Sequence, residues 1–178
     1  MKILQIAKFP PTEKGGIEKL AKQICELSRS SENRYDILCF DKRGRSRIDI
    51  LPAYTVFRTR TLLTILSTPL SLHNLYFLRK IVHNYDLIYV HLPNPLSALY
   101  VLLVAKNKKI IAHFHAQVQP SAAYFLYKWL EKILLDNAHA IIITNPRTAE
   151  SPALEGFRHK IKVIPLGLSR EDYNIPSE

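Results

Sequence analysis

The chain alternates between short apolar runs and longer segments in which apolar residues recur with helical spacing. The short runs are rich in Ile, Val and Leu and lie at residues 2–8, 35–40, 87–91, 109–113, 140–144 and 162–164. Runs of this length with little polar alternation are typical of parallel strands buried on both faces. These segments are therefore predicted to be buried parallel strands, with a further strand at residues 54–58.

Between the strands, apolar side chains repeat at the i, i+3, i+4, i+7 spacing of one helix face. The first set is Ile17, Leu20, Ala21, Ile24 and Leu27, and a later set is Ala123, Leu126, Leu130, Ile133 and Leu134. Another helix is predicted from about Ser71, because Pro69 should break the long stretch at residues 62–84 near its start. Strands that alternate with helices predict an α/β fold, a Rossmann-like doubly wound and mainly parallel sheet with helices on both faces. Ligands then bind beyond the carboxyl ends of the strands.

The 178 residues include 25 Lys and Arg against 15 Asp and Glu, so the formal net charge is +10. This length suits one domain with a single core. The positive charge suits an anionic partner, such as phosphate, lipid headgroups or nucleic acid, without choosing among them. Nucleic acid is not expected as a partner, since no recognised motif for binding it is present.

The sequence also indicates where the protein resides. No stretch approaches the roughly 18 consecutive apolar residues of a membrane span. Gln5 and Lys8 interrupt the amino terminus before the apolar core of a signal peptide can form. Cys25 and Cys39 lack the spacing of a disulfide framework or a zinc knuckle. A cytoplasmic protein with two buried, reduced thiols is therefore expected.

A basic segment follows the second predicted strand. Lys42, Arg43, Arg45 and Arg47 are expected in an exposed loop, where they could contact an anionic membrane at the inner face of the cell membrane. The aromatic segment at residues 124–129 has two open interpretations: its rings pack in the core, which is favoured, or they touch the same membrane. If they pack in the core, the basic side chains form a solvated face.

Two adjacent glycines stand at the start of the first predicted helix. Gly15 and Gly16 would let backbone N–H groups approach an anion, and the helix dipole favours negative charge there. The pattern is neither a GxGxxG fingerprint nor a P-loop, so an NAD enzyme and a P-loop ATPase are poorly supported. A phosphate site is one hypothesis, and a loop that needs a tight turn before a helix is the other.

Four stretches, in this order, resemble family 4 glycosyltransferases of the GT-B type. The first is KILQI (residues 2–6) with FPP (9–11) and GGIE (15–18) at the start of a helix. The others are YDLIYVH (85–91) with PNP (93–95), IIAHFH (110–115), and KVIPLGL (162–168) with an aromatic residue at 173. The resemblance covers essentially the whole chain. It implies one half of a GT-B architecture.

The resemblance further implies a domain organisation and an activity. Residues 1–164 would be the amino-terminal, acceptor-side domain, and residues 165–178 would begin an inter-domain linker. The donor-binding carboxy-terminal domain is absent, so the isolated chain is expected to be inactive and to need that domain in cis or in trans. The complete hexosyltransferase would move a sugar from a UDP- or GDP-linked donor to a sugar or lipid-linked acceptor, in cell-surface polysaccharide or glycolipid synthesis. Transfer would be retaining and would use no metal or other cofactor.

Site residues follow from the same resemblance. Gly15 and Gly16 would lie near the donor diphosphate, and His115 would be the catalytic residue at the cleft. Where the family often places Ser after the strand at 140–144, this chain has Asn145 followed by proline, which is good chemistry for starting a helix.

Further candidates lie on the acceptor side. These are His91, Asn94 and Asn145. His113 should share a sheet face with His115 and is expected to be structural. No metal site is expected, because no carboxylate or cysteine at ligand spacing accompanies the histidines. A noncatalytic α/β subunit that binds a phosphorylated ligand or a partner glycosyltransferase half remains the alternative function.

Overall fold

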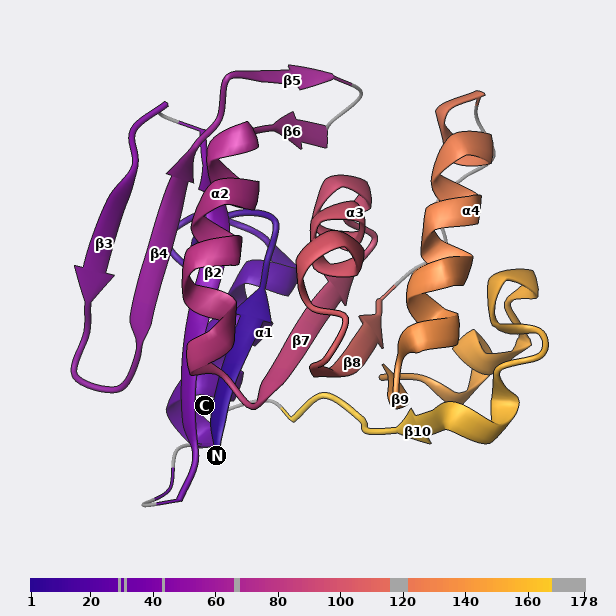
Figure 1. The fold of residues 1–178 in the computed structure, drawn as a ribbon. Coiled ribbons are helices and arrows are strands. Elements are labelled where there is room, and N and C mark those ends of the chain that lie inside the picture. Colours follow the sequence, from indigo (N-terminus) through magenta and orange to yellow (C-terminus); the bar gives the residue numbers. More distant parts are fainter. Residues whose placement is uncertain (29, 31, 43, 66–67, 116–121, 168–178) are drawn as a thin grey trace, which may run out of the picture.

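An eight-stranded sheet runs through the computed structural model, which describes residues 1–28, 30, 32–42, 44–65, 68–115 and 122–167, with backbone only for residues 122–126 (Figure 1). The strand order is β10-β9-β8-β7-β1-β2-β4-β3. The strands are β1 (Lys2–Ile6), β2 (Arg34–Asp41), β3 (Arg47–Ile50), β4 (Thr55–Arg60), β7 (Leu87–Leu92), β8 (Lys109–Phe114), β9 (Ala140–Ile143) and β10 (Ile161–Val163). All neighbours pair in parallel except β3 with β4.

Helices cover both faces of this sheet. They are α1 (Gly16–Leu27), α2 (Leu72–Ile81), α3 (Pro95–Val104) and α4 (Ala122–Asn137), with 3₁₀ turns at Val82–Asn84, Pro146–Glu150, Pro152–Leu154 and Arg158–Lys160. In Figure 1, α2, α3 and α4 lie in front of the sheet and α1 lies behind it. The predicted doubly wound, mainly parallel fold is confirmed.

The alternation of side chains along β1 shows how the two faces are filled. Leu4 and Ile6 belong to the large core cluster that also holds Leu78 of α2 and Val101 of α3. The alternate side chains, Ile3 and Gln5, point to the α1 face, where Ile3 belongs to a smaller cluster and Gln5 is buried. β1 is therefore buried on both sides, which explains its nearly continuous apolar sequence.

The two cysteines lie in the layer between α1 and the sheet. Cys25 of α1 and Cys39 of β2 are both fully buried and free. Burial raises the pKa of the Cys25 thiol to about 12 and raises that of Cys39 as well. Both groups therefore remain protonated at neutral pH, as expected of structural thiols.

Side-chain caps begin two of the helical elements. Ser71 caps α2, because its side chain accepts the backbone N–H of Asn74 at 3.1 Å. Asn145 accepts the N–H of Arg147 at 2.9 Å, and Pro146 follows it. The predicted cap at Asn145 is confirmed, although the element that it starts is a five-residue 3₁₀ turn.

The basic segment corrects one prediction. Arg47 does not lie in a loop but begins β3, the antiparallel edge strand. Asp49 explains this strand, since its carboxylate pairs with Arg47 at 3.3 Å and with Arg58 of β4 at 2.6 Å. Ile48 and Ile50 are exposed, so the strand has no apolar pattern that would predict it.

A hairpin was also not predicted. Strands β5 (Leu63–Ile65) and β6 (Thr68–Leu70) pair antiparallel at the start of the stretch that looked helical. Pro69 lies within β6, which forms only this two-stranded ribbon and therefore tolerates a residue without an N–H group. The helix prediction from Ser71 onward is confirmed.

The aromatic segment divides between the two interpretations. Tyr127 is 4% exposed, as the favoured core interpretation predicts, whereas Trp129 is 66% exposed. Positions two apart on a helix face different directions, so one ring is buried and the other reaches solvent. The side chains at residues 124–126, like Arg43 and residues 168–178 of the predicted linker, lie outside the described residues. Within the described part, no helix has the length and apolar character needed to cross a membrane.

Candidate functional site

Three histidines gather at the carboxyl ends of two neighbouring parallel strands. His91 lies near the end of β7 and pairs in register with His113 of β8. His115 follows β8 directly, and its backbone N–H donates to the carbonyl of Leu92 at 3.2 Å. Because alternate residues share a sheet face, all three rings stand on the α1 side. The sequence prediction that His113 and His115 face the same way is confirmed by their stacked rings, whose centroids are 3.9 Å apart.

A chain of hydrogen bonds connects His115 to the core. Its Nε2 lies 3.0 Å from His91 Nδ1, and His91 Nε2 lies 2.9 Å from Gln5 Oε1. Gln5 Nε2 donates to the carbonyl of Ala21 at 3.0 Å and contacts Cys25 Sγ at 2.9 Å. Gln5 is completely buried on β1, so its amide is anchored between the sheet and α1. Sequence reasoning missed it, since a single polar residue in an apolar strand gives no functional signal.

The protons along this chain of hydrogen bonds can be assigned from its buried end, the carbonyl of Ala21. The carbonyl of Ala21 can only accept, so it faces the Gln5 amide N–H, and Gln5 Oε1 then faces His91. An amide oxygen also only accepts, so His91 carries its proton on Nε2 and presents a bare Nδ1. His115 must therefore donate from Nε2. The remaining nitrogen of neutral His115, Nδ1, is a hydrogen-bond acceptor.

Burial keeps these imidazoles neutral. It lowers the pKa of His115 to about 4. Burial, followed by repulsion from His115, lowers the pKa of His113 to about 3, and the pKa of His91 is held well below its ordinary value mainly by burial. At neutral pH the cluster therefore offers lone pairs and N–H groups rather than positive charge.

His113 has a different set of contacts. Its Nδ1 lies 2.8 Å from the hydroxyl of Tyr89, which agrees with the expected structural role. Its Nε2 is buried and has no hydrogen-bond partner within the described part of the chain. Because His113 is only 2% exposed, this nitrogen is also shielded from water. The cluster therefore contains one ring nitrogen whose hydrogen-bonding capacity the described residues leave unused.

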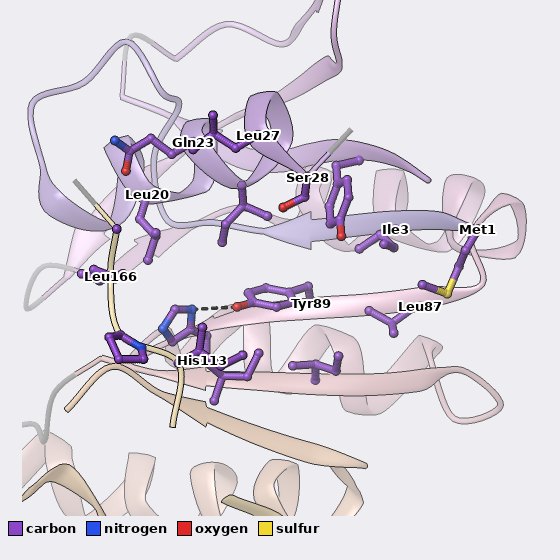
Figure 2. Close-up of a pocket in the computed structure, with 17 residues that line it drawn as sticks. Met1, Ile3, Leu20, Gln23, Leu27, Ser28, Leu87, Tyr89, His113 and Leu166 are labelled. Atoms are coloured by element: carbon purple, nitrogen blue, oxygen red, sulfur yellow. Dashed lines mark hydrogen bonds between the residues drawn. The ribbon is translucent and has the colours of Figure 1, made fainter. Parts of the chain in front are cut away.

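A pocket of about 400 Å³ reaches this histidine from the α1 side (Figure 2). Leu20 and Leu27 of α1 lie across it from Leu87 and Tyr89 of β7, and His113 closes one end beside Leu166. The walls are apolar, so the pocket suits a hydrophobic group. The sequence did not indicate it, because its lining comes from several elements distant in sequence.

The two glycines lie at the start of α1, after the loop that leaves β1. Gly15 is the N-cap, and a Cβ added there would stand 2.0 Å from Glu18 Oε2. A Cβ on Gly16 would meet nothing within 4 Å. The carboxylate of Glu18 is mostly buried against the helix start, a position that the dipole favours. An anion at the glycines would have to displace this carboxylate, which the glycine signal did not indicate.

Besides Glu18, Lys8 is a charged residue near this helix start that the motif of Gly15 and Gly16 did not include. It lies in the loop that leads to the same helix start, where burial lowers its pKa and the negative charge of Glu18 opposes that shift. A lysine coupled to Glu18 supplies positive charge near the position predicted for phosphate.

Of the acceptor-side candidates, His91 belongs to the histidine cluster, whereas Asn94 and Asn145 occupy separate capping positions. Asn94 is buried and caps α3, with its Oδ1 3.4 Å from the N–H of Ser97, while its Nδ2 has no partner among the described residues. Asn145 is exposed and uses its Oδ1 as a cap. Each lies just beyond the carboxyl end of a strand, at the same edge of the sheet as the histidines.

The basic candidates lie beyond β2. Lys42 is engaged within the molecule, because its Nζ lies 3.3 Å from Glu13 and 4.1 Å from the ring centre of Phe9. Arg45 and Arg47 are exposed. Lys42 in the turn after β2 and Arg45 in the loop before β3 lie where the sequence predicted them, whereas Arg47 begins β3.

Comparison with known proteins places the chain in a family. The sequence pattern described as Glycosyltransferase Family 4 matches residues 14–172. O-antigen chain mannosyltransferase C of Escherichia coli is 26% identical over 181 residues, which cover 100% of this chain and 49% of that protein. D-rhamnosyltransferase WbpZ of Pseudomonas aeruginosa is 27% identical over 180 residues, covering 99% and 47%. The chain spans about half the length of the curated relatives it matches.

Solved structures show the same fold. Sucrose-phosphate synthase from Thermosynechococcus elongatus superposes with a TM-score of 0.69 at 17% identity, covering 96% of this chain and 49% of that one. Anabaena Alr3699/HepE, solved in complex with UDP and glucose, gives a TM-score of 0.60 at 17% identity, with 96% and 46% covered. The eight-stranded unit corresponds to one half of such GT-B structures.

Proposed function

The chain belongs to glycosyltransferase family 4, and we propose that it is the acceptor-side domain of an enzyme that transfers a sugar from a nucleotide sugar to an acceptor hydroxyl. The observation that carries this proposal is the chain of hydrogen bonds that runs from the buried Gln5 side chain through His91 to His115. It fixes one imidazole at the strand ends, where α/β sheets bind ligands, with a single nitrogen left to face a substrate.

His115 would act on the transferred sugar and the acceptor. Its Nδ1, bare in the neutral ring, accepts a hydrogen bond from a hydroxyl and holds that hydroxyl in place for reaction. A pKa near 4 makes the ring a weak base, so it is suited to orienting a hydroxyl rather than to removing its proton outright. The departing phosphate would take the acceptor proton as the acceptor oxygen bonds to the anomeric carbon, so no protein base would be needed. A retaining, metal-independent transfer is what the family resemblance implies.

The diphosphate would lie at the start of α1. Backbone N–H groups at Gly15 and Gly16 would stabilise the charge that develops on the departing phosphate. Glu18 would leave this position when the donor binds, which frees the Lys8 ammonium for the same phosphate. Donor binding is thereby coupled to the rotamer of one carboxylate.

A second domain would complete the enzyme. Residues 1–164 would form the acceptor-side domain and residues 165–178 the start of the linker, and the donor-binding half would be supplied in cis or in trans. Two relatives are named as a mannosyltransferase of O-antigen chains and a D-rhamnosyltransferase. These names support a hexose or deoxyhexose as the transferred sugar and a cell-surface polysaccharide or glycolipid as the product. The enzyme would act in the cytoplasm, at the inner face of the cell membrane.

Assays of the native gene product test this function. Its mass in its own cell shows whether the donor half is in the same polypeptide, and a separate half is otherwise captured with this domain as bait. The complete protein is then incubated with UDP- and GDP-linked hexoses and a lipid-linked acceptor. Transfer from one donor is expected, whereas release of no sugar from any nucleotide in the presence of both halves would contradict the proposal.

A further inference from the structure

The histidine cluster offers three nitrogen ligands to one point. His91, His113 and His115 each bring one ring nitrogen within 4.8 Å of the other two, and the first two are buried. We propose that this cluster binds one divalent transition-metal ion of the zinc class. The site was not expected from the sequence, because the three residues come from two strands and no carboxylate or cysteine lies at ligand spacing.

Two of the three rings are already oriented as ligands. A metal-bound histidine usually donates its other N–H to an acceptor, which fixes the ring and the tautomer. Gln5 Oε1 holds Nε2–H of His91 at 2.9 Å, and this leaves Nδ1 bare. The hydroxyl of Tyr89 lies 2.8 Å from Nδ1 of His113 and can accept its proton, which leaves Nε2 bare. These are the outer contacts that a metal site needs.

The unused atom of His113 supports the same conclusion. Its Nε2 is buried and has no hydrogen-bond partner in the described chain, a costly condition for a polar atom. The ring of His115 is stacked directly on that of His113. A metal ion at the cluster would give the unpartnered nitrogen a ligand bond in place of a missing hydrogen bond.

The donor set selects the kind of ion. Three imidazoles without a carboxylate suit Zn²⁺, Cu²⁺ or Ni²⁺, whereas Mg²⁺ and Ca²⁺ prefer oxygen ligands. Three protein ligands leave a fourth position for water.

Distances show what must move. Two nitrogens on a tetrahedral zinc ion lie about 3.3 Å apart, and His91 Nδ1 is 3.0 Å from His115 Nε2. The proton on that His115 nitrogen has to shift to Nδ1, and the ring has to turn out of its stack with His113. No net proton is released, because neutral His115 only changes tautomer.

Occupation by a metal would have a consequence for catalysis, and this consequence alone rests on the proposed function. The ion would replace the hydrogen bond between His91 and His115 and would place a proton on the nitrogen assigned to the acceptor hydroxyl. Metal binding and sugar transfer would therefore exclude each other. The binding itself can be measured without any transfer assay.

Calorimetric titration of the 178-residue chain with ZnSO₄, and with MgCl₂ as the reference salt, tests the site. One saturable Zn²⁺ site per chain is expected, with none for Mg²⁺. His113→Ala and His91→Ala should each weaken Zn²⁺ binding by at least about tenfold. His83→Ala should leave it unchanged, because His83 is exposed in the turn that precedes β7.

Cobalt(II) binding to the native chain provides a second test, which does not require any variant to fold. Binding to the native chain should give visible d–d absorption without a thiolate charge-transfer band, since the thiols of Cys25 and Cys39 are not ligands in the proposed site. Tyr89→Phe keeps the ring and should weaken binding several-fold. Absence of a saturable site, a thiolate band, or equal affinity in His113→Ala and the native chain would each overturn the proposal.

Discussion

His115 Nε2 lies 3.0 Å from His91 Nδ1, at the ends of neighbouring parallel strands. This contact transmits the tautomer of one imidazole to the next, because His91 is itself fixed by a buried amide. The Gln5 side chain on β1 therefore determines that Nδ1 of His115, the nitrogen that faces away from His91, carries no proton. The chemistry assigned to His115 depends on this arrangement.

Replacement of Gln5 should release the tautomers. In the native domain, nitrogen NMR of the imidazoles should show both His91 and His115 protonated on Nε2. Gln5→Leu removes the acceptor for His91, so both rings should populate the other tautomer, and the unpaired N–H should cost about 1–3 kcal/mol of stability. Tyr89→Phe is the control and should leave both tautomers unchanged. A native spectrum with His115 protonated on Nδ1 would contradict the hydrogen-bond assignment.

Acid should destabilise the domain through the same histidines. The pKa of His115 is lowered from 6.5 to about 4 and that of His113 to about 3, so the unfolded chain binds protons more readily than the folded one. The stabilisation is fully present well above pH 6.5 and is lost as the pH falls toward the folded pKa values, by about 1.5 kcal/mol per histidine between pH 6.5 and 5.

Urea unfolding at pH 7.5 and pH 5 measures this loss. In His115→Gln the difference between the two pH values should shrink, because one titrating group is gone. His83→Gln should leave the difference unchanged. An equal loss of stability in the native domain and in His115→Gln would assign the acid sensitivity to other groups.

Removal of the Glu18 charge should strengthen anion binding at α1. In Glu18→Gln, inorganic pyrophosphate should bind the isolated domain several-fold more tightly, since the negative charge that now lies beside Gly15 is lost. Calorimetry at low salt measures the change. Glu26→Gln, an exposed change in the same helix beside Lys22, is the matched control. Equal affinities in Glu18→Gln and the native domain would remove the glycine site as a phosphate site.

The glycines themselves should differ in their tolerance of substitution. Gly16→Ala adds a methyl group in open space within α1 and should stabilise the domain by up to about 1 kcal/mol, because alanine favours helix. Gly15→Ala should displace the Glu18 carboxylate and yield no such gain. Thermal unfolding of the two variants compares them. A gain at Gly15 equal to that at Gly16 would contradict the close contact.

Contact with an anionic membrane should require the basic residues beyond β2. The double change Arg45→Ala and Arg47→Ala should reduce co-sedimentation with phosphatidylglycerol vesicles at low salt, because each basic residue near such a surface contributes about 1 kcal/mol. Lys106→Ala with Lys109→Ala removes the same charge at the amino end of β8 and should have little effect. If the native domain does not bind these vesicles, the membrane hypothesis falls.

Strands could be predicted from the sequence where apolar burial holds them and not where ion pairs do. β1 and β2 were predictable because their residues are buried on both faces, which leaves nearly continuous apolar runs. The edge strand β3 was not, because it is held by Asp49 pairing with arginines rather than by apolar burial. The hairpin β5–β6 is similarly short and lies outside the main sheet.

Only two residues of the hydrogen-bonded chain, His91 and His115, could be predicted from the sequence. His115 and His91 were named from a family resemblance, and their strands are adjacent in the sheet. Gln5 contacts a residue 86 positions away, so only tertiary structure reveals that the two are partners. Glu18 was part of the quoted motif, yet its carboxylate could not be placed over Gly15 without the backbone geometry of the helix start.

The catalytic role of His115 is the central claim, and one comparison tests it most directly. In the proposed two-domain enzyme, His115→Ala should lower the kcat of sugar transfer at least about 100-fold while the donor Kd changes less than about threefold. His83→Ala, an exposed histidine in the turn before β7, should match the native enzyme. A His115→Ala enzyme that retains transfer within about threefold of the native rate would contradict the account.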